Sequence, residues 1–181
     1  MDTEQRGNFF QLAGKTAVII GGTGVLGREM ARGLIQLGVN VAVIGRKTKL
    51  PEEYTRALEF GPGKFLLVTG DVLDRVKLEE NRDQIIESFG QIDFLINCAG
   101  GNHPSATTNP DQAFPDLPVE GLQSTFDLNL MGTVLACQVF GKVMIDAKRG
   151  SIVNITSMAA DRPLTRIPAY AAAKAGVRNF T

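Results

Sequence analysis

Residues 15–27 read KTAVIIGGTGVLG, so a compact apolar run leads directly into a run rich in glycine. Beyond it, apolar residues recur at helical spacing from Leu26 to Leu37, and Gly38 supplies a stop. Glycine permits the tight turn that joins a strand to a helix at close range. The sequence therefore predicts a strand, a glycine turn and a helix in that order.

The same alternation continues along the chain. Short apolar runs predict buried strands at Lys15–Ile20, Val41–Ile44, Phe65–Thr69, Asp93–Asn97 and Ser151–Thr156. Helical patterns lie between them, notably at about 75–89 and 118–147, and a long irregular stretch covers Gly100–Leu117. Near-continuous apolar strands separated by helices are typical of a parallel sheet covered on both faces. We therefore expect an α/β fold with a Rossmann-type, doubly wound parallel sheet, which binds ligands at the carboxyl ends of its strands.

Length and composition set limits on function. The 181 residues suit one domain, which we place at 13–181 after an N-terminal tail at 1–12. Because 19 basic and 19 acidic residues cancel, we expect no nucleic-acid partner and no anionic membrane partner. We find no apolar run long enough to span a bilayer and no leader, so we expect a cytoplasmic protein. Two cysteines without ligand spacing favour neither a disulfide framework nor a metal site.

The glycine run has the spacing Gly22-x-Gly24-x-x-Gly27. Between a strand and a helix, such glycines let the backbone approach a dinucleotide, and the helix N-terminus receives its pyrophosphate. An ordinary strand-to-helix turn is the alternative. We predict that the cofactor contacts Gly21, Gly22, Thr23, Gly24, Val25, Leu26 and Gly27.

The end of the second strand bears on which dinucleotide is bound. An acidic residue there would bind the ribose 2′-hydroxyl and favour NAD. The chain instead has Gly45-Arg46-Lys47, and two cations suit a 2′-phosphate. We therefore predict that Arg46 and Lys47 favour NADP(H), with NAD(H) possible; both side chains could instead be solvated surface charges.

Two further strand ends contribute candidates for cofactor binding. Asp71 and Val72 follow the third strand, where a side chain could reach the adenine edge. The fourth strand ends in Asn97-Cys98-Ala99-Gly100, whose small residues allow a cofactor to lie close to the backbone. Their position at the carboxyl ends of strands makes Asp71, Val72, Asn97, Ala99 and Gly100 candidates.

Tyr170 and Lys174 lie one helical turn apart, thirteen residues after Ser157. Taken together with the glycine run, the Asn97–Gly100 segment and Asn129, these residues resemble the short-chain dehydrogenase/reductase family from about residue 13 onward. The resemblance implies hydride transfer between a nicotinamide cofactor and a carbonyl. It also implies a homo-oligomer, usually a tetramer.

The chemistry of that reaction suits these residue types. A carbonyl that accepts hydride needs a proton on its oxygen, and a free Tyr titrates near ~10. Lys174, at i+4 on the same helix face, can lower the pKa of Tyr170 by favouring the phenolate. The resemblance implies that Lys174 also contacts the nicotinamide ribose, that Ser157 orients the substrate oxygen, and that Asn129 supports a water-linked proton relay. Taken singly, each could be an ordinary packed, capping or exposed residue.

The sequence departs from the family pattern in two respects. Val25 stands where the commonest glycine pattern of the family has glycine. The family continues after the helix that bears Tyr170, whereas this chain stops at Thr181 within that helix. We therefore expect the last strands of the domain to lie outside this chain.

Two segments bear on the substrate. Residues 100–104 and 161–168 resemble a subgroup of the family described as D-mannonate oxidoreductases, or fructuronate reductases, which implies a uronate or aldonate as the small-molecule substrate. Arg162 and Arg166 could pair with a carboxylate, and Asn102 and His103 could bind hydroxyls. Solvated loop residues and loop-tethering salt bridges are the alternatives.

Three functions remain open from the sequence. The first is an NADP(H)-preferring reductase that interconverts D-fructuronate and D-mannonate. The second is a short-chain reductase for another carbonyl, such as a 3-oxoacyl thioester. The third is a non-catalytic nucleotide-binding module.

Overall fold

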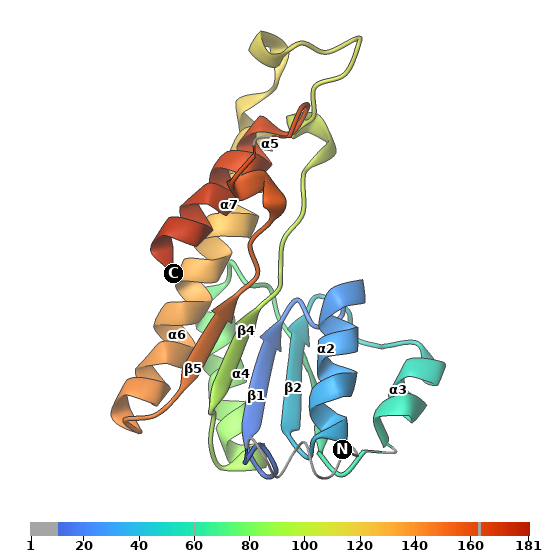
Figure 1. Ribbon diagram of the computed structural model, residues 1–181, viewed down its shortest axis with the longest axis vertical. Coiled ribbons are helices and arrows are strands. Elements are labelled where there is room, and N and C mark those ends of the chain that lie inside the picture. Colours follow the sequence, from blue (N-terminus) through green and yellow to red (C-terminus); the bar gives the residue numbers. More distant parts are fainter. Residues whose placement is uncertain (1–10, 60, 163) are drawn as a thin grey trace.

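The computed structural model describes residues 11–59, 61–162 and 164–181. Its centre is a sheet of five parallel strands in the order β3-β2-β1-β4-β5 (Figure 1). The strands are β1 (Thr16–Ile20), β2 (Asn40–Gly45), β3 (Phe65–Thr69), β4 (Phe94–Asn97) and β5 (Ser151–Asn154). The chain reverses its direction of winding between β1 and β4, which confirms the predicted doubly wound sheet and creates the crevice where such sheets bind ligands.

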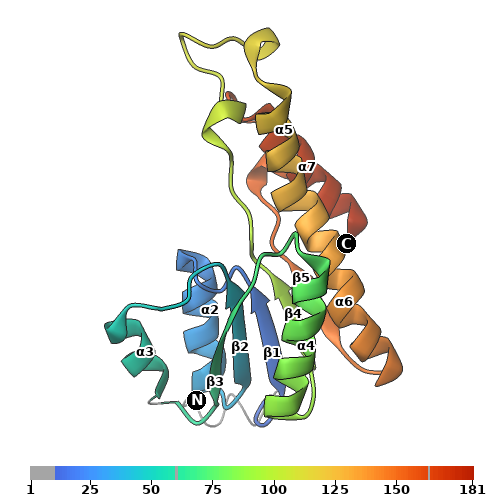
Figure 2. The ribbon, with the colours of Figure 1, turned by 180° about the vertical axis from the view of Figure 1, so that it is seen from behind.

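Helices cover both faces of the sheet. They are α2 (Val25–Gln36), α3 (Glu52–Glu59), α4 (Arg75–Phe89), α5 (Val119–Phe126), α6 (Gly132–Asp146) and α7 (Pro168–Phe180). Figure 1 faces the side of α2 and α3, and Figure 2 faces the side of α4 and α6. Alternate residues of one strand serve the two faces: Ile19 packs with the first pair of helices, Val18 and Ile20 with the second.

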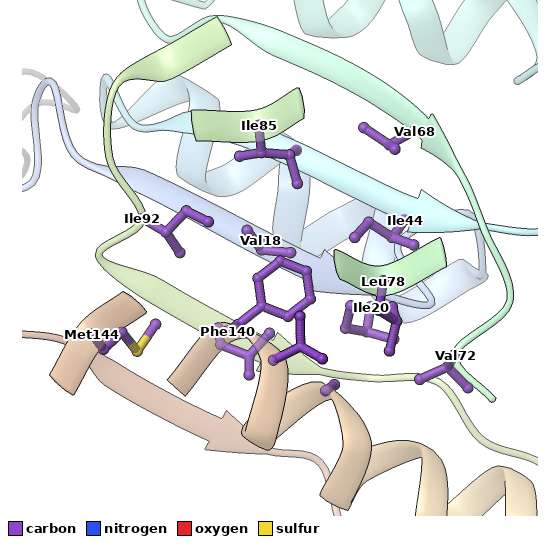
Figure 3. Close-up of a cluster of buried hydrophobic side chains, with 14 residues drawn as sticks. Val18, Ile20, Ile44, Val68, Val72, Leu78, Ile85, Ile92, Phe140 and Met144 are labelled. Carbon is purple, nitrogen blue, oxygen red and sulfur yellow. The ribbon is translucent and has the colours of Figure 1, made fainter. Parts of the chain in front are cut away.

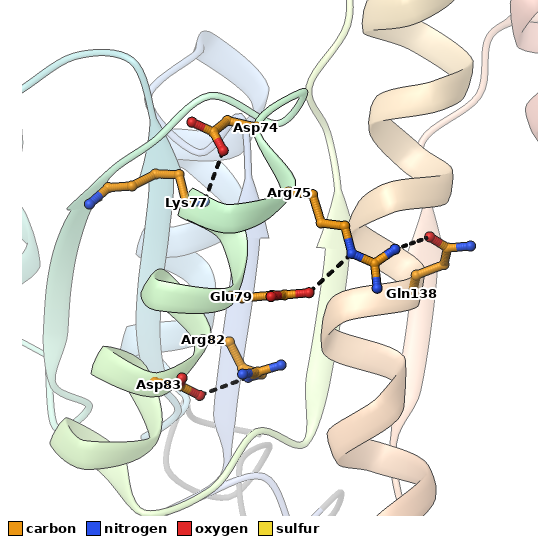
Figure 4. A network of polar contacts seen from close by, with 7 residues as sticks. All are labelled: Asp74, Arg75, Lys77, Glu79, Arg82, Asp83 and Gln138. Carbon is orange, nitrogen blue, oxygen red and sulfur yellow. Dashed lines mark hydrogen bonds and ion pairs between the residues drawn. The ribbon is translucent and has the colours of Figure 1, made fainter.

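The core on the α4 and α6 side is the larger of the two clusters. Phe140 of α6 is fully buried and points toward Val18 of the sheet (Figure 3). At the start of α4, Asp74 accepts the backbone N–H of Lys77 at 3.0 Å and so caps the helix. Arg75 donates to Gln138 of α6 at 3.1 Å, which links the two helices on the surface (Figure 4).

Three predicted strands are shorter than expected, β1 and β4 by one residue at their starts and β5 by two at its end. Asp93 precedes β4, and its carboxylate accepts the backbone N–H of Thr16 at 2.9 Å. β5 stops at Asn154, since the next two residues bind α7: the Ile155 carbonyl accepts from Lys174, and the Thr156 hydroxyl donates to the Lys174 carbonyl. The bends at these ends serve tertiary contacts that a local pattern does not reveal.

The predicted helix at 118–147 is one continuous helical rod with a π-helical turn, η3 (Asp127–Met131), between α5 and α6. The expectation that the chain has no apolar run long enough to span a bilayer needs correction here. Val119–Asp146 is long and apolar enough to cross a membrane by length and composition, since an 18-residue window within it has a mean hydropathy of 1.5. A core helix passes the same test, and Val139 and Phe140 are buried against the sheet. Packing in the core accounts for the buried part of this apolar helix, whereas Val119 and Ile145 are exposed.

The Gly100–Leu117 stretch rises beyond the carboxyl ends of β4 and β5, beside α5 and the start of α7 (Figures 1 and 2). Its path includes short 3-10 turns at Pro104–Ala106 and Phe114–Asp116. The backbone N–H of Thr108 donates to the Arg166 carbonyl at 2.9 Å, which ties this stretch to the loop before α7. Of the predicted tail at 1–12, residues 1–10 lie outside the described residues, and the domain boundary remains a prediction.

Candidate active site

A cleft of about 640 Å³ opens at the carboxyl ends of the central strands. The glycine turn forms part of its wall. Gly21 has a φ of 77°, a left-handed conformation that favours glycine, and its N–H donates to the Ile44 carbonyl at 2.8 Å. Gly24 lies at the N-cap of α2 and lines the cleft, and an added Cβ would lie 3.3 Å from the Gly21 carbonyl oxygen, which is a tight contact.

Close backbone packing requires the other glycines of the run. A Cβ on Gly21 would lie 2.6 Å from the Ala99 Cα, and one on Gly27 would lie 2.5 Å from the Gly22 Cα. The start of α2 therefore packs closely against the turn after β1, and the N-terminus of the helix is directed at the cleft. This cradle fits the pyrophosphate of a dinucleotide, which backbone N–H groups and the helix dipole attract.

The structure distributes the predicted glycine-run residues unevenly. Gly21, Thr23 and Gly24 line the cleft. Gly22 and Gly27 are buried in the packing of the turn, whereas Val25 and Leu26 are exposed on the first turn of α2. These three lining residues are therefore the best placed to contact a ligand directly.

The end of β2 contributes Gly45 and Arg46 to the lining of the cleft. Lys47 is exposed but is not among the lining residues. Arg46 is therefore the better placed of the two predicted cations for a 2′-phosphate.

The predicted adenine-side residues, Asp71 and Val72, both line the cleft. Asp71 accepts the backbone N–H of Leu73 at 3.0 Å, so its carboxylate is held in a local turn. Ala99 and Gly100 also line the cleft, whereas Asn97 is buried behind it and donates to Asn154 at 2.8 Å. The side chain of Asn97 supports the strand ends instead of facing the ligand.

Lys174 of α7 has an exposed fraction of only 4%. Its Nζ donates to the Ile155 carbonyl at 2.9 Å and lies 5.9 Å from the centre of the Tyr170 ring. Burial lowers the pKa of Lys174, and the nearby Cys98 thiol opposes that shift. The predicted placement of Tyr170 and Lys174 on one helix face is therefore observed.

Gly100 allows a second group to approach Lys174. A Cβ at this position would lie 2.7 Å from the Asn129 Oδ1 and 3.1 Å from the Lys174 Nζ. Asn129 is fully buried in the π-helical turn, where it accepts the N–H of Gly101 at 3.0 Å and donates to the Gly101 carbonyl at 2.7 Å. Such turns are frequent at functional sites, and this one brings Asn129 and Lys174 to the same small patch of backbone.

Ser157 lies at the N-cap of a 3-10 turn, Met158–Ala160, where its Oγ accepts the backbone N–H of Ala159 at 3.1 Å. Capping was the structural alternative for this residue. A hydroxyl that accepts one bond can still donate its own hydrogen. The geometry therefore leaves Ser157 able to donate to a substrate oxygen.

The predicted substrate residues divide into two groups. Asn102 and His103 line the cleft, and the His103 ring is held 2.7 Å from the Ser105 hydroxyl. Arg162 and Arg166 are exposed and do not line it. Arg166, with a φ of 74°, instead borders a separate hollow of about 470 Å³ beside the alanines of α7. The structure thus brings the hydroxyl candidates to the cleft but not the arginines.

The cleft also has lining residues that the sequence did not single out. They include Ser124 and Thr125 of α5 and the two residues Asp127 and Leu128 shortly after it. No local motif marks them, because they reach the cleft through the packing of α5 against the loop after β4. A Ser/Thr-rich turn of a helix gives no such signal by itself.

Known proteins resemble this chain over nearly its whole length. Residues 15–181 match the family model of the short chain dehydrogenases. The uncharacterized oxidoreductase UxuB of Bacillus subtilis (strain 168) is 43% identical over 178 residues, which are 94% of this chain and 64% of that protein. D-threitol dehydrogenase of Mycolicibacterium smegmatis is 33% identical over 168 residues, 93% of this chain and 62% of the relative.

A solved structure from Haemophilus influenza, provisionally described as a D-mannonate oxidoreductase and containing bound NAD, superposes with a TM-score of 0.87. It is 37% identical and covers 94% of this chain, which in turn covers 64% of that protein. This chain therefore spans about 64% of the length of such relatives. Sequence match, fold and the paired Tyr170 and Lys174 agree, and the chain belongs to the short chain dehydrogenase family.

Proposed function

We propose that this chain is the nucleotide-binding and catalytic part of an NADP(H)-dependent oxidoreductase that interconverts D-fructuronate and D-mannonate. One observation carries the proposal: the buried Lys174 lies against the Tyr170 ring and beside Gly100 at the end of β4, and the neighbouring strand β1 ends in the glycine cradle. Tyr170 and Lys174 would supply proton transfer, and the glycine cradle would supply a place for a dinucleotide.

Tyr170 is the group that would place a proton on the substrate oxygen. When bound, the nicotinamide would supply the hydride for the carbonyl carbon. The cationic form of Lys174 would favour the Tyr170 phenolate and so ease proton release. Ser157 would donate its hydroxyl hydrogen to the same oxygen and hold it in place. Asn129 would support the proton supply from the buried side, beside Gly100.

The sugar-acid substrate has support from two sources. Asn102 and His103 line the cleft and could bind substrate hydroxyls. The relative of 37% identity is provisionally described as a D-mannonate oxidoreductase. Binding of the substrate carboxylate by Arg162 and Arg166 stays a prediction, and their exposed positions outside the cleft give it no support.

The preference for NADP(H) rests on this chain's own residues at the end of β2. Arg46 lines the cleft, and Gly45 stands where an acidic residue would favour NAD. The relative from Haemophilus influenza was solved with NAD, so direct competition must decide. The Kd for NADPH should be lower than that for NADH, and Arg46→Ala should remove the difference; equal preference in both proteins would refute this assignment.

We further propose a cytoplasmic homo-oligomer, a tetramer by family resemblance, without nucleic-acid or membrane partners. The equal numbers of acidic and basic residues support the absence of a nucleic-acid partner. Analytical ultracentrifugation of the protein expressed from its complete gene tests the oligomer, and a monomer at micromolar concentration would overturn it.

The central experiment measures NADPH consumption with D-fructuronate by the protein from its complete gene. Tyr170→Phe should lower kcat by about 10²–10⁴-fold with an almost unchanged Kd for NADPH. The other tyrosine of the chain provides a matched control, because Tyr54 packs in the core on the α2 and α3 side of the sheet and donates to the Arg28 carbonyl. Tyr54→Phe should keep turnover within a few-fold.

The result also separates the alternatives. Near-normal turnover by Tyr170→Phe would refute the mechanism. Reduction of 3-oxoacyl thioesters without turnover of uronates would show that the proposed sugar-acid substrate is wrong. Binding of NADPH without turnover of any carbonyl would leave a nucleotide-binding module.

A further inference from the structure

Gly45, the last residue of β2, faces Thr23 across the cleft edge. A Cβ built on Gly45 would lie 2.5 Å from the Thr23 Oγ1, 2.8 Å from its Cγ2 and 3.2 Å from its Cβ. Both residues line the cleft, and Thr23 has an exposed fraction of only 9%. The side chain of Thr23 therefore fills the space into which any side chain at position 45 would project.

Rotation of Thr23 cannot clear this space. A β-branched side chain has two heavy γ-atoms on the three staggered positions around its Cβ. In the observed rotamer, both occupied positions lie within 3 Å of the added Cβ. Because the two γ-atoms of Thr23 must take two of the three positions, every rotamer leaves at least one γ-atom in one of the two positions close to the added Cβ. A change of rotamer therefore exchanges one close contact for another.

The backbone at both positions is also held. The N–H of Gly70 donates to the Gly45 carbonyl at 3.1 Å, and the N–H of Gly21 donates to the Ile44 carbonyl at 2.8 Å. β2 pairs with β1 up to Ile44 on one side, and with β3 up to its last residue, Gly45, on the other. Neither Gly45 nor the glycine turn can move away without breaking these bonds.

We infer that Thr23 is a specificity-determining residue: its side chain excludes an acidic residue from position 45 and thereby leaves Arg46 to select a 2′-phosphorylated dinucleotide. An acidic side chain at the end of the second strand is the group that binds a ribose 2′-hydroxyl. The inference rests on the proposed dinucleotide function. It adds a steric cause for the NADP(H) preference to the effect of the Arg46 charge, and it assigns that steric cause to Thr23 in the turn after β1.

Paired variants of the protein from its complete gene test the steric cause. The comparison is between Thr23→Ala/Gly45→Asp and Thr23→Val/Gly45→Asp, because Ala vacates both γ positions whereas Val keeps both and lacks only the hydroxyl. The readouts are the Kd values for NADH and NADPH from titration calorimetry and the melting temperature without nucleotide.

The Ala-based double variant should shift the NADH/NADPH affinity ratio toward NADH by about 10–100-fold, the range expected from one charge-assisted hydrogen bond. The Val-based double variant and Gly45→Asp alone should melt at lower temperature and show no such shift. Thr23→Ala alone should give no shift of the affinity ratio toward NADH, whatever its Kd values, since position 45 then still lacks a carboxylate.

Each contrary result has a distinct meaning. Equal shifts in the Ala-based and Val-based variants, or a full shift in Gly45→Asp alone, would overturn the steric role of Thr23 and leave the proposed function standing. An unchanged protein that binds neither dinucleotide would overturn the proposed function and this inference with it. Equal binding of NADH and NADPH by the unchanged protein would overturn the assigned selectivity, but not dinucleotide binding.

Discussion

Replacing Asn129 by Ala removes a three-bond bridge between the helical rod and the cleft wall. The side-chain amide donates to the carbonyls of Gly101 at 2.7 Å and Thr125 at 2.8 Å, and its oxygen accepts the Gly101 N–H at 3.0 Å. The side chain is fully buried, so water cannot replace these bonds without local opening. The variant leaves both backbone groups of Gly101 without this partner.

The magnitude follows from the number of bonds. A typical intramolecular hydrogen bond contributes about 0.5–1.5 kcal/mol, so three contribute about 2–4 kcal/mol. For a chain of this size, about 1 kcal/mol lowers Tm by about 2–4 °C. A loss near 3 kcal/mol therefore predicts a Tm lower by about 6–12 °C. Since Gly100 and Gly101 line the cleft, the Kd for NADPH should rise as well.

Urea unfolding followed by far-UV circular dichroism measures the loss, because the chain contains no Trp to serve as a fluorescent probe. Asn179→Ala is the matched control: it removes the same amide from an exposed site of α7 and should change the free energy of unfolding by less than about 0.5 kcal/mol. A loss below about 1 kcal/mol in Asn129→Ala would show that the bridge does not anchor the cleft wall.

Three further predictions concern the turn, the buried lysine and the base of the sheet. Gly27→Ala should destabilise the protein by about 1–3 kcal/mol, because its Cβ meets the Gly22 backbone. Gly33→Ala, which has open space in the same helix, should stabilise the protein by about 0.5–1 kcal/mol. Calorimetry that ranks the two variants otherwise contradicts the packing argument. Burial lowers the pKa of Lys174, so between that lowered pKa and the ordinary value of 10.5 the unfolded chain binds more protons and stability rises with pH. Urea midpoints between pH 7 and 10 should therefore rise less in Lys174→Met, and identical slopes would exclude this source. Asp93→Asn should lower the free energy of unfolding by about 1–3 kcal/mol in chemical denaturation, because the carboxylate accepts the Thr16 N–H and lies 3.3 Å from Arg149. An unchanged midpoint would refute the anchoring role of Asp93.

Much of the fold follows from local pattern. Each predicted strand exists, because buried parallel strands are short apolar runs that the alternation with helices identifies. The helix α3, which we did not predict, depends on long-range contacts: Tyr54 and Leu58 pack against the far face of the sheet, and Tyr54 donates to the Arg28 carbonyl of α2. A helix of this length has little stability in isolation, so its sequence carries a weak signal.

The candidate site was predictable where one element positions both partners. Tyr170 and Lys174 share a face because they are four residues apart on one helix. The arginines show the opposite case, since Arg162 and Arg166 stand between Ser157 and Tyr170 in sequence but lie outside the cleft. Their positions depend on how the loop leaves the site, which the Thr108–Arg166 backbone bond and the positive φ of Arg166 determine.

Cofactor selection illustrates the limit most clearly. The sequence shows that the second strand ends in Gly45 and Arg46, and charge alone then predicts a preference for a 2′-phosphate. It does not show why glycine stands at position 45, because the reason lies in Thr23, which is 22 residues earlier and on another strand's turn. The parallel pairing of β1 with β2 brings these two strand ends together. A substitution designed from charge alone would therefore meet a steric obstacle, and the turn and the strand end must be changed together.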